Sequence, residues 1–448
     1  MLWNGEKGTL TDCIFINNSV NLLNVSNISY VGGGAVYWNG TLGNLNNCIF
    51  TNNSFNITGV NVTYVGGGAV YWRGTLGNLN NCIFTDNSFN SHVLNFDGSG
   101  GGAIQWSGIN GTISDSIFIH NFNNATGGGA VFWSTLNGKL INCNFTNNIA
   151  ESGAGVWWLG ANGTLINSNF INNIAYFSHG GGVYWRGANG TLTNCTFIKN
   201  SVMTRGGGVY WNGVNGSLTI CSFISNSAMS RGGGVYWNGV NGSLTICSFI
   251  SNSADFGGGV YWGGVNGTIN RCNFTNNLGR SNSGGVSLAA ANGTVNNCIF
   301  TSNTANAGGG IYIHGVNGTV NDCIFNTNNA IRGASVYCYG TNGNVFRCSF
   351  KDNHATYGDN VYWFWTVEDF LNKYEQIHDF DYIYIRNGIG TPLRTIVLNK
   401  KGVTLSGQST NVIFDAKGGN VHFEVTGDNV LIEKITFRNF NFIKKIRL

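Results

Sequence analysis

Hydrophobic and polar residues recur along this chain as one block that is 25 to 27 residues long in most places. Each block holds a glycine cluster, a Val-Tyr-Trp triplet, an Asn-Gly turn, an aliphatic residue, a Cys-x-Phe triplet and an asparagine. The valine lies 14 residues before the next phenylalanine in all twelve cases, whereas the connection from phenylalanine to the next valine varies from 11 to 21 residues. Constant spacing is typical of strands held in register, and variable spacing is typical of a loop.

Three short strands per block fit this pattern, at Val-Tyr-Trp, at the aliphatic residue and at Cys-x-Phe. Strand alternation places valine and tryptophan inside and tyrosine outside. A repeat of this length predicts a solenoid, so residues 1–363 are expected to form an all-β, right-handed parallel β-helix of about 13 coils. The handedness follows because parallel crossovers are nearly always right-handed. Phe197 and Phe223 should then lie one coil apart, at ~4.8 Å.

Glycine and asparagine each occupy an invariant column. A glycine lies seven residues before every phenylalanine, and asparagine precedes it in ten of thirteen blocks. Asn-Gly is expected to supply the positive-φ residues of a tight turn. An asparagine also lies three residues after every phenylalanine. This residue is expected to adopt left-handed backbone and to hydrogen-bond along a ladder of stacked amides.

Eleven of the twelve cysteines share the position two residues before the phenylalanine. One interpretation is a buried ladder of free thiols, which suits a small inward-facing residue. The other is a set of disulfides between neighbouring coils, although parallel stacked side chains aim poorly for that bond. Zinc binding is disfavoured because no Cys-x-x-Cys pair exists.

Residues 364–448 have a different pattern and carry 9 of the 19 acidic and 11 of the 23 basic residues. Thr366 precedes two acidic residues and predicts the start of a short helix. Strand-like triplets follow at residues 403–405, 412–414, 421–423 and 435–437. The segment is therefore expected to hold a short helix and the opening coils of a second β-helix-like module.

Composition excludes several classes of protein. Charged residues are only 9% of the chain and the net charge of +4 is scattered, which argues against a nucleic-acid-binding surface. Apolar runs are far shorter than the ~18 residues of a membrane span. The N-terminus reads as the middle of a repeat and not as a signal peptide. We expect a piece of a longer protein, without its secretion signal and anchor, or a chain with a misassigned start.

Catalytic residues are not evident in the repeat region. β-Helical polysaccharide lyases and hydrolases need clustered carboxylates, whereas residues 1–363 hold only ten acidic residues. Asp12, Asp115 and Asp322 share one column but lie in distant coils, where they replace asparagine. The sequence therefore predicts no catalytic residues, no metal site and no cofactor.

Two features could bind a ligand. The first is a column of tyrosines that would form an aromatic strip for sugar rings, or would only stack to stabilise the sheet: Tyr184, Tyr210, Tyr236 and Tyr261. The second is a set of long loops at residues 19–31, 54–65 and 88–99, because long loops on a rigid scaffold commonly carry recognition. These loops hold Asn-x-Ser/Thr sequences, and so potential N-glycosylation sites, at Asn24, Asn27, Asn56 and Asn61.

A family resemblance appears at the repeated motifs. Gly-Gly-Ala-Val-Tyr at residues 33–37, followed by Phe50 and Asn53, resembles the GGA(I/L/V) and FxxN repeats of polymorphic outer-membrane proteins. It resembles the repeats of adhesin-like surface proteins of methanogenic archaea even more. In many coils the alanine is glycine, as at Gly208. The resemblance implies a pectin-lyase-like β-helix on the cell surface or outside the cell, binding a surface protein or glycan of another cell. The alternatives are a polysaccharide-degrading enzyme and a purely structural stalk or envelope protein.

Overall fold

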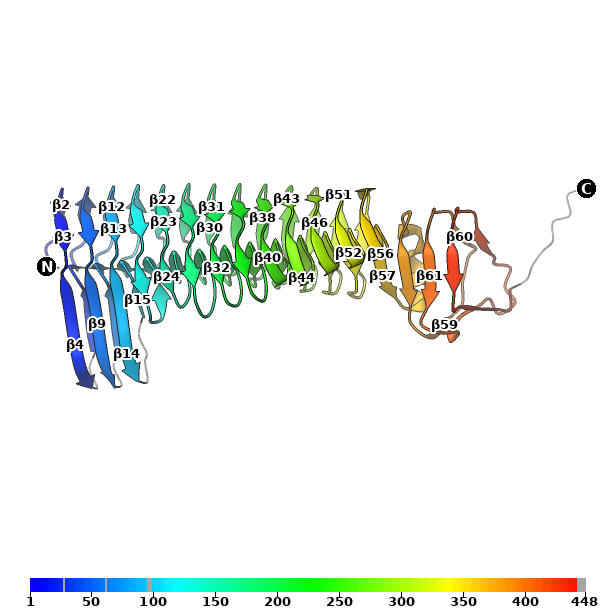
Figure 1. Ribbon diagram of the computed structural model, residues 1–448, viewed down its shortest axis with the longest axis horizontal. Helices are drawn as coiled ribbons and strands as arrows, with labels where there is room; N and C mark the ends of the chain where they lie inside the picture. The colour runs from blue at the N-terminus through cyan, green and yellow to red at the C-terminus, as the bar shows by residue number, and fades with distance from the viewer. Residues whose placement is uncertain (27–28, 61–62, 95–98, 441–448) are drawn as a thin grey trace, which may run out of the picture. The chain divides into compact units, whose positions relative to one another are not determined.

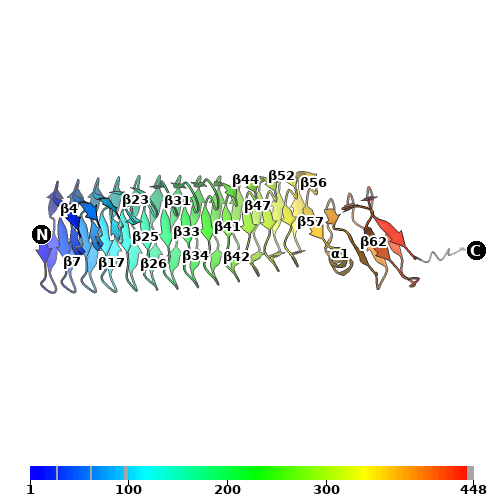
Figure 2. The same ribbon diagram turned by 90° about the horizontal axis from the view of Figure 1, so that it is seen from below.

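The computed structural model describes residues 1–26, 29–60, 63–94 and 99–440. The chain folds as an all-β parallel solenoid of about 13 coils, in which strands of successive coils pair in parallel (Figures 1 and 2). Its residues group into two compact units, residues 1–273 and residues 274–448.

Each regular coil of the first unit contains four strands. One coil consists of β29 (Val183–Trp185), β30 (Thr191–Thr193), β31 (Thr196–Ile198) and β32 (Ser201–Val202). The first three strands match the three that the sequence predicts. The fourth was missed because two residues are too few to show a period of two.

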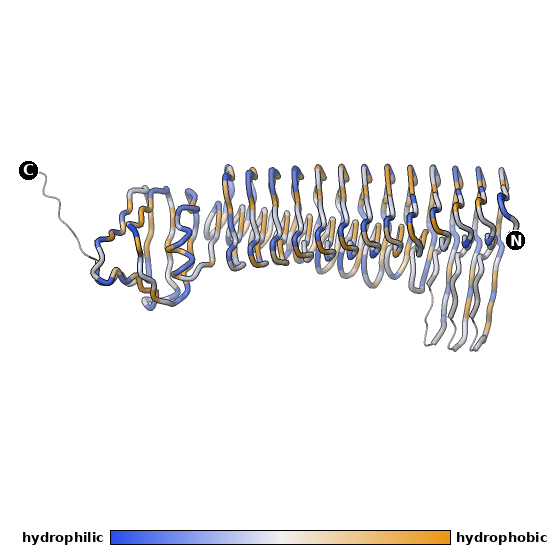
Figure 3. Tube along the Cα trace, turned by 180° about the vertical axis from the view of Figure 1, so that it is seen from behind, coloured by the Kyte–Doolittle hydropathy of each residue, from blue (hydrophilic) through white to orange (hydrophobic). Residues whose placement is uncertain are grey.

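Two aromatic columns fill the interior of the first unit. Phe197 and Phe223 pair in register, with ring centroids 4.8 Å apart, which confirms the predicted one-coil spacing. Ten tryptophans stack in successive coils at 4.6 to 5.0 Å between ring centroids: Trp3, Trp38, Trp72, Trp106, Trp133, Trp158, Trp185, Trp211, Trp237 and Trp262. Figure 3 shows hydrophobic and hydrophilic positions alternating in the same way from coil to coil.

The invariant glycine is explained by the tryptophan column. A Cβ atom on Gly216 would lie 2.3 Å from Nε1 of Trp211, and the other coils with a tryptophan show the same contact. The left-handed backbone of this turn belongs to the preceding residue, Asn215, with a φ of 54°. The predicted turn is present, but asparagine supplies the positive φ and glycine supplies space for the indole. The Trp211 indole N–H donates to the carbonyl of Gly213 at 2.9 Å, so its polar atom is satisfied inside the core.

The asparagine ladder is also present, and its side chains are buried. Asn226 is 0% exposed, and its amide bridges the coils before and after it. The expectation of left-handed backbone at this position is wrong, because the positive φ of 54° belongs to the preceding Ser225. The left-handed residue turns the chain, and the next residue therefore points into the core.

All twelve cysteines are free thiols, as the first interpretation of their column predicted. The Cys221 thiol donates to the carbonyl of Thr219 at 3.4 Å, and most other cysteines make the same contact two residues back. Each of these thiols thereby has a partner within its own coil.

The predicted helix is confirmed in the second unit as α1 (Val367–Lys373). The Thr366 hydroxyl accepts from the backbone N–H of Asp369, and the Asp369 carboxylate accepts from the backbone N–H of Thr366. This reciprocal capping box fixes where the helix begins. In the part of the chain that the structure describes, no helix is long and apolar enough to span a membrane.

Parallel pairing continues beyond residue 363 within the second unit. The strands that follow the last Val-Tyr-Trp triplet pair in the order β57 (Val361–Trp365), β58 (Tyr382–Ile385), β61 (Thr404–Gly407) and β64 (Leu431–Glu433). Further pairs join β59 (Gly388–Gly390) to β62 (Val412–Asp415) to β65 (Thr436–Arg438), and β60 (Ile396–Leu398) to β63 (Phe423–Val425). The four strand-like triplets of the sequence therefore all fall on or beside observed strands.

Candidate functional site

The long connections of the first three coils form strands and not the predicted loops. The outgoing strands pair in parallel as β4 (Ser19–Ser26), β9 (Ser54–Val60) and β14 (Ser88–Leu94). The returning strands form a four-stranded sheet of β5 (Ser29–Gly33), β10 (Thr63–Gly67), β15 (Ser99–Gly101) and β20 (Gly127–Gly128). Figure 1 shows β4, β9 and β14 extending well beyond the other strands of their coils. We call the described residues of these segments, 19–26, 29–33, 54–60, 63–67, 88–94 and 99–101, the arch.

The arch has a small hydrophobic core of its own. Phe55 and Phe89 are 0% exposed and stack with centroids 5.3 Å apart. Ile57 is also buried, and Val20 and Leu22 pack against this cluster. Phe55 and Ile57 lie two residues apart, which is the spacing of one strand face. This alternation in the sequence is typical of a strand. Loops were predicted instead because the connections vary in length.

A row of amides runs across the surface of the arch. The Asn56 Nδ2 donates to the Oδ1 of Asn21, and the Asn90 Nδ2 donates to the Oδ1 of Asn56, both at 2.8 Å. The Asn56 Nδ2 also donates to the Ser54 hydroxyl at 3.2 Å. Both amide hydrogens of Asn56 are therefore already used, which disfavours attachment of a glycan there.

The other predicted glycosylation residues differ in their surroundings. Asn24 is exposed and left-handed, with a φ of 55°, at a shift in strand register between Leu22 and Val25. Its side chain is thus well placed for modification. Asn27 and Asn61 lie outside the described residues. Glycosylation at these positions stays a prediction.

The tyrosine column is brought together as the sequence predicted. Tyr184, Tyr210, Tyr236 and Tyr261 pair in register on four successive strands. The expectation that they face open solvent is wrong for the two central members, because Tyr210 and Tyr236 are only 6% and 5% exposed. Burial, with its tyrosine neighbours, raises the pKa of Tyr210 to about 12. Glycan binding by this column stays a prediction.

Cationic and imidazole side chains cover these tyrosines. The Arg205 guanidinium lies 5.4 Å from the ring centroid of Tyr236, and the His179 ring lies 4.2 Å from that of Tyr210. Burial and the charge of Arg205 lower the pKa of His179 to about 4. In the next coil, the Arg231 guanidinium lies over the ring of Tyr261 in the same way. Sequence reasoning missed this set, although its members each directly precede a glycine cluster.

The acidic residues do not assemble into a metal site in the residues that the structure describes, where no group of three or more histidine, cysteine, aspartate or glutamate side chains could hold an ion. Asp12, Asp115 and Asp322 adopt φ values of 55°, 50° and 52°. They therefore occupy a left-handed turn position that asparagine fills in other coils, as the sequence suggested. Asp322 is paired with Arg347 through two hydrogen bonds of 2.7 and 2.9 Å.

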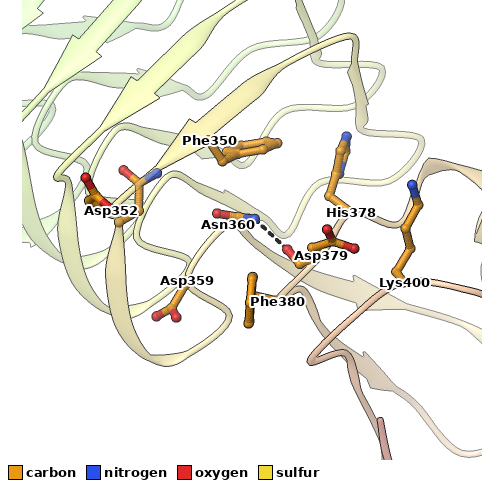
Figure 4. A pocket seen from close by; sticks show the side chains of 9 residues that line it. Phe350, Asp352, Asp359, Asn360, His378, Asp379, Phe380 and Lys400 are labelled. Carbon is orange, nitrogen blue, oxygen red and sulfur yellow. Dashed lines mark hydrogen bonds between the residues drawn. The ribbon is translucent and has the colours of Figure 1, made fainter. Parts of the chain in front are cut away.

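A cavity of about 470 Å³ lies within the second unit, and sequence analysis did not predict it (Figure 4). Its lining comes from residues spread between positions 350 and 400, so no local motif marks it. The lining residues are Phe350, Asp352, Asn353, Asp359, Asn360, His378, Asp379, Phe380 and Lys400.

Comparison with known proteins agrees with this architecture. Residues 154–314 match the family described as "Right handed beta helix region". The chain contains a right-handed β-helix. No curated protein sequence matches this β-helical chain.

Several solved structures are similar to this β-helical chain at low identity. They include the alginate lyase AlyF-OU02 in a complex (11% identity, 94% of this chain, 83% of that chain, TM-score 0.36). A second is a PL6 alginate lyase in a complex with a trisaccharide (12% identity, 94% of this chain, 88% of that chain, TM-score 0.30). A third is a mutant of the periplasmic alginate epimerase AlgG (10% identity, 94% of this chain, 85% of that chain, TM-score 0.25). At these values the similarity carries no conclusion about activity.

Proposed function

We propose that this chain is an adhesin-like segment of a cell-surface protein, in which a rigid β-helix presents the arch to a surface protein or glycan of another cell. The observation that carries the proposal is the arch itself. Its described strands belong to two parallel sheets, and it has its own buried aromatic pair, Phe55 and Phe89.

The β-helix does not need the arch to close its coils. A later coil runs from Phe145 to Val156 in eleven residues, whereas the coil that starts at Phe50 uses twenty residues to reach Val70. The later connection makes only the two-residue strand β24 (Ile149–Ala150). Connecting segments that extend from a rigid scaffold commonly carry recognition. The amide row on the arch offers amide oxygens as hydrogen-bond acceptors at a regular, one-coil spacing.

The test is adhesion by a variant whose arch is shortened. Removing residues 22–31, 57–65 and 91–99 leaves eleven residues between phenylalanine and valine in each coil. We expect this variant to fold and to bind whole cells or immobilised glycans at least about tenfold more weakly, a change of ~1.4 kcal/mol. Near-ultraviolet circular dichroism of the tryptophan column verifies that the fold is retained.

A finer test uses point variants with a matched control. Replacing Asn21, Asn56 and Asn90 by alanine removes the amide row without shortening the arch. Replacing Asn212 and Asn238 by alanine removes a similar exposed pair, in which Asn238 donates to Asn212 at 2.7 Å, elsewhere in the same unit. We expect weaker binding in the first variant and parental binding in the second. Full adhesion after the arch has been shortened would refute the proposal.

The same preparations discriminate the alternatives. Turnover of alginate or another acidic polysaccharide by the intact chain would favour a polysaccharide-degrading enzyme. Normal folding with no binding to any cell or glycan would favour a structural stalk.

A further inference from the structure

The phenylalanine column and the asparagine ladder of the second unit both stop at the same coil. Phe300 and Phe325 are 0% exposed, and Phe325 stacks on Phe350 with centroids 5.5 Å apart. Phe350 keeps part of its surface exposed, because no further phenylalanine continues the column. His378 packs edge-on against it, with centroids 5.0 Å apart. The ladder likewise stops at Asn353.

Two hydrogen-bond donors of Asn353 have no acceptor among the described residues. In the preceding coil, the backbone N–H and the Nδ2 of Asn328 both donate to the Oδ1 of Asn353, each at 3.0 Å. Asn353 accepts these bonds and donates one amide hydrogen to the carbonyl of Phe325 at 2.9 Å. Among the described residues, none accepts from its backbone N–H or its second amide hydrogen. The residue is only 8% exposed, and unpaired donors at such depth are costly.

The last residues of both columns, Phe350 and Asn353, line the cavity of Figure 4. Its volume of about 470 Å³ lies within the range of small-molecule sites. Asp352 and Asp379 add carboxylates to the lining. One oxygen of Asp379 accepts from the backbone N–H of Lys401 at 2.9 Å, which holds the carboxylate in place and leaves its other oxygen available.

We propose that this cavity binds an N-acetylated hexosamine unit of a glycan. The acetamido carbonyl is the same chemical group as an asparagine side-chain amide. It accepts both free N–H groups of Asn353, as the amide of a following coil would. The sugar ring lies against the exposed part of Phe350, and the carboxylates of Asp352 and Asp379 accept hydrogen bonds from its hydroxyl groups.

Each element of the site selects for this ligand class. A hexose without the acetamido group leaves the donors of Asn353 unpaired, and unpaired buried donors give strong discrimination between ligands. A purely aromatic ligand would make no hydrogen bond with the carboxylates of Asp352 and Asp379. The site uses no residue of the arch, so it goes beyond the proposed function and can be tested independently of it.

The experiment titrates the full chain with N-acetylglucosamine, and with glucose and glucosamine for comparison, by calorimetry and saturation-transfer NMR. We expect N-acetylglucosamine to bind at least about tenfold more tightly than either sugar without the acetyl group, a difference of ~1.4 kcal/mol. The variants Phe350→Leu and Asp379→Asn should each weaken binding by a similar factor. Asp428→Asn, an exposed carboxylate outside the cavity, should bind as the parent does.

Thermal melts of each variant verify that the second unit remains folded. Equal affinity for glucose and N-acetylglucosamine would overturn the proposal, as would parental affinity in Phe350→Leu and Asp379→Asn together. Binding of a peptide with the Phe-x-x-Asn sequence, but of no sugar, would show that the cavity accepts another coil and would also overturn it. Retention of N-acetylglucosamine binding in the arch-shortened variant separates this site from the proposed adhesive surface.

Discussion

The Oδ1 of Asn226 accepts hydrogen bonds from both the backbone N–H and the Nδ2 of Asn200, each at 3.0 Å. Asn226 repeats the same two donations to Asn252, at 2.9 and 3.0 Å, and its Nδ2 also donates to the carbonyl of Phe197 at 2.9 Å. One side chain thus satisfies polar groups of both adjacent coils. This arrangement explains why asparagine is invariant at a fully buried position.

Asn226→Ala should destabilise the protein strongly. The substitution removes four side-chain hydrogen bonds and leaves buried partners on Asn200 and Phe197 unpaired. We expect the free energy of unfolding to fall by about 3 kcal/mol, the upper end of the cost of an unsatisfied buried group. Chemical denaturation measures this change. Asn238→Ala, at an exposed amide pair, is the control and should have little effect. Identical melting of Asn226→Ala and the parent would show that the ladder is not stabilising.

Gly216→Ala tests the contact between the glycine and tryptophan columns. The new methyl group would lie 2.3 to 2.4 Å from three atoms of the Trp211 indole. The ring stacks on both neighbours and cannot move aside, so we expect a loss of about 1–3 kcal/mol, typical of an overpacked core. Gly263→Ala is the matched control, because its added methyl group would meet no atom closer than 3.4 Å. If both variants unfold at the same denaturant concentration, the explanation of the glycine column is wrong.

The thiol ladder should resist alkylation in the folded state. Burial raises the pKa of Cys143 to about 12, so on the order of one molecule in ten thousand carries the reactive thiolate at pH 8. Cys13 is partly exposed at the first coil. Iodoacetamide at pH 8 should therefore modify Cys13 and leave Cys143 intact, whereas denatured protein should react at all twelve cysteines. Mass spectrometry of peptides measures the result, and rapid labelling of Cys143 without denaturant would contradict its burial.

Tyrosine burial should make stability fall at alkaline pH. The pKa of Tyr210 is about 12 in the folded chain and about 10 in an unfolded one. The protonated form is therefore favoured by folding, and its contribution is fully present below pH 10 and is lost as pH rises through 12. Urea denaturation at pH 9 and at pH 11.5 should show this loss. Tyr210→Phe, which cannot ionise, should lose less of its free energy of unfolding between these two pH values. An unchanged loss in this variant would rule out Tyr210 as its source.

Replacing Tyr210 or Tyr236 by alanine should destabilise the protein. Strand alternation places tyrosine outside, so the sequence alone predicts little loss of stability for Tyr210→Ala and Tyr236→Ala. At 6% and 5% exposure, each change should cost roughly 3 kcal/mol, as for a buried aromatic residue. A test of glycan binding by this column therefore needs Tyr→Phe variants, which keep the ring and remove only the hydroxyl.

The sequence by itself determined the β-helix, its coil register and its inward columns, because a period repeated about a dozen times carries the same information in every coil. The invariant spacing from Val183 to Phe197 is one example, and Thr366 similarly marked the start of a helix through local capping.

Only the tertiary structure decided how surface segments and unfinished columns are used. Arg205 covers Tyr236 although 31 positions separate them, and no local pattern reports that contact. The arch became strands because three adjacent coils pair their extensions, so that each extension supplies hydrogen-bond partners for the next. The cavity at Phe350 and Asn353 exists because the following segment departs from the repeat and leaves an aromatic face and two donors without their usual partners. Such features depend on which residues become neighbours after folding, and that information is not contained in the spacing of a repeat.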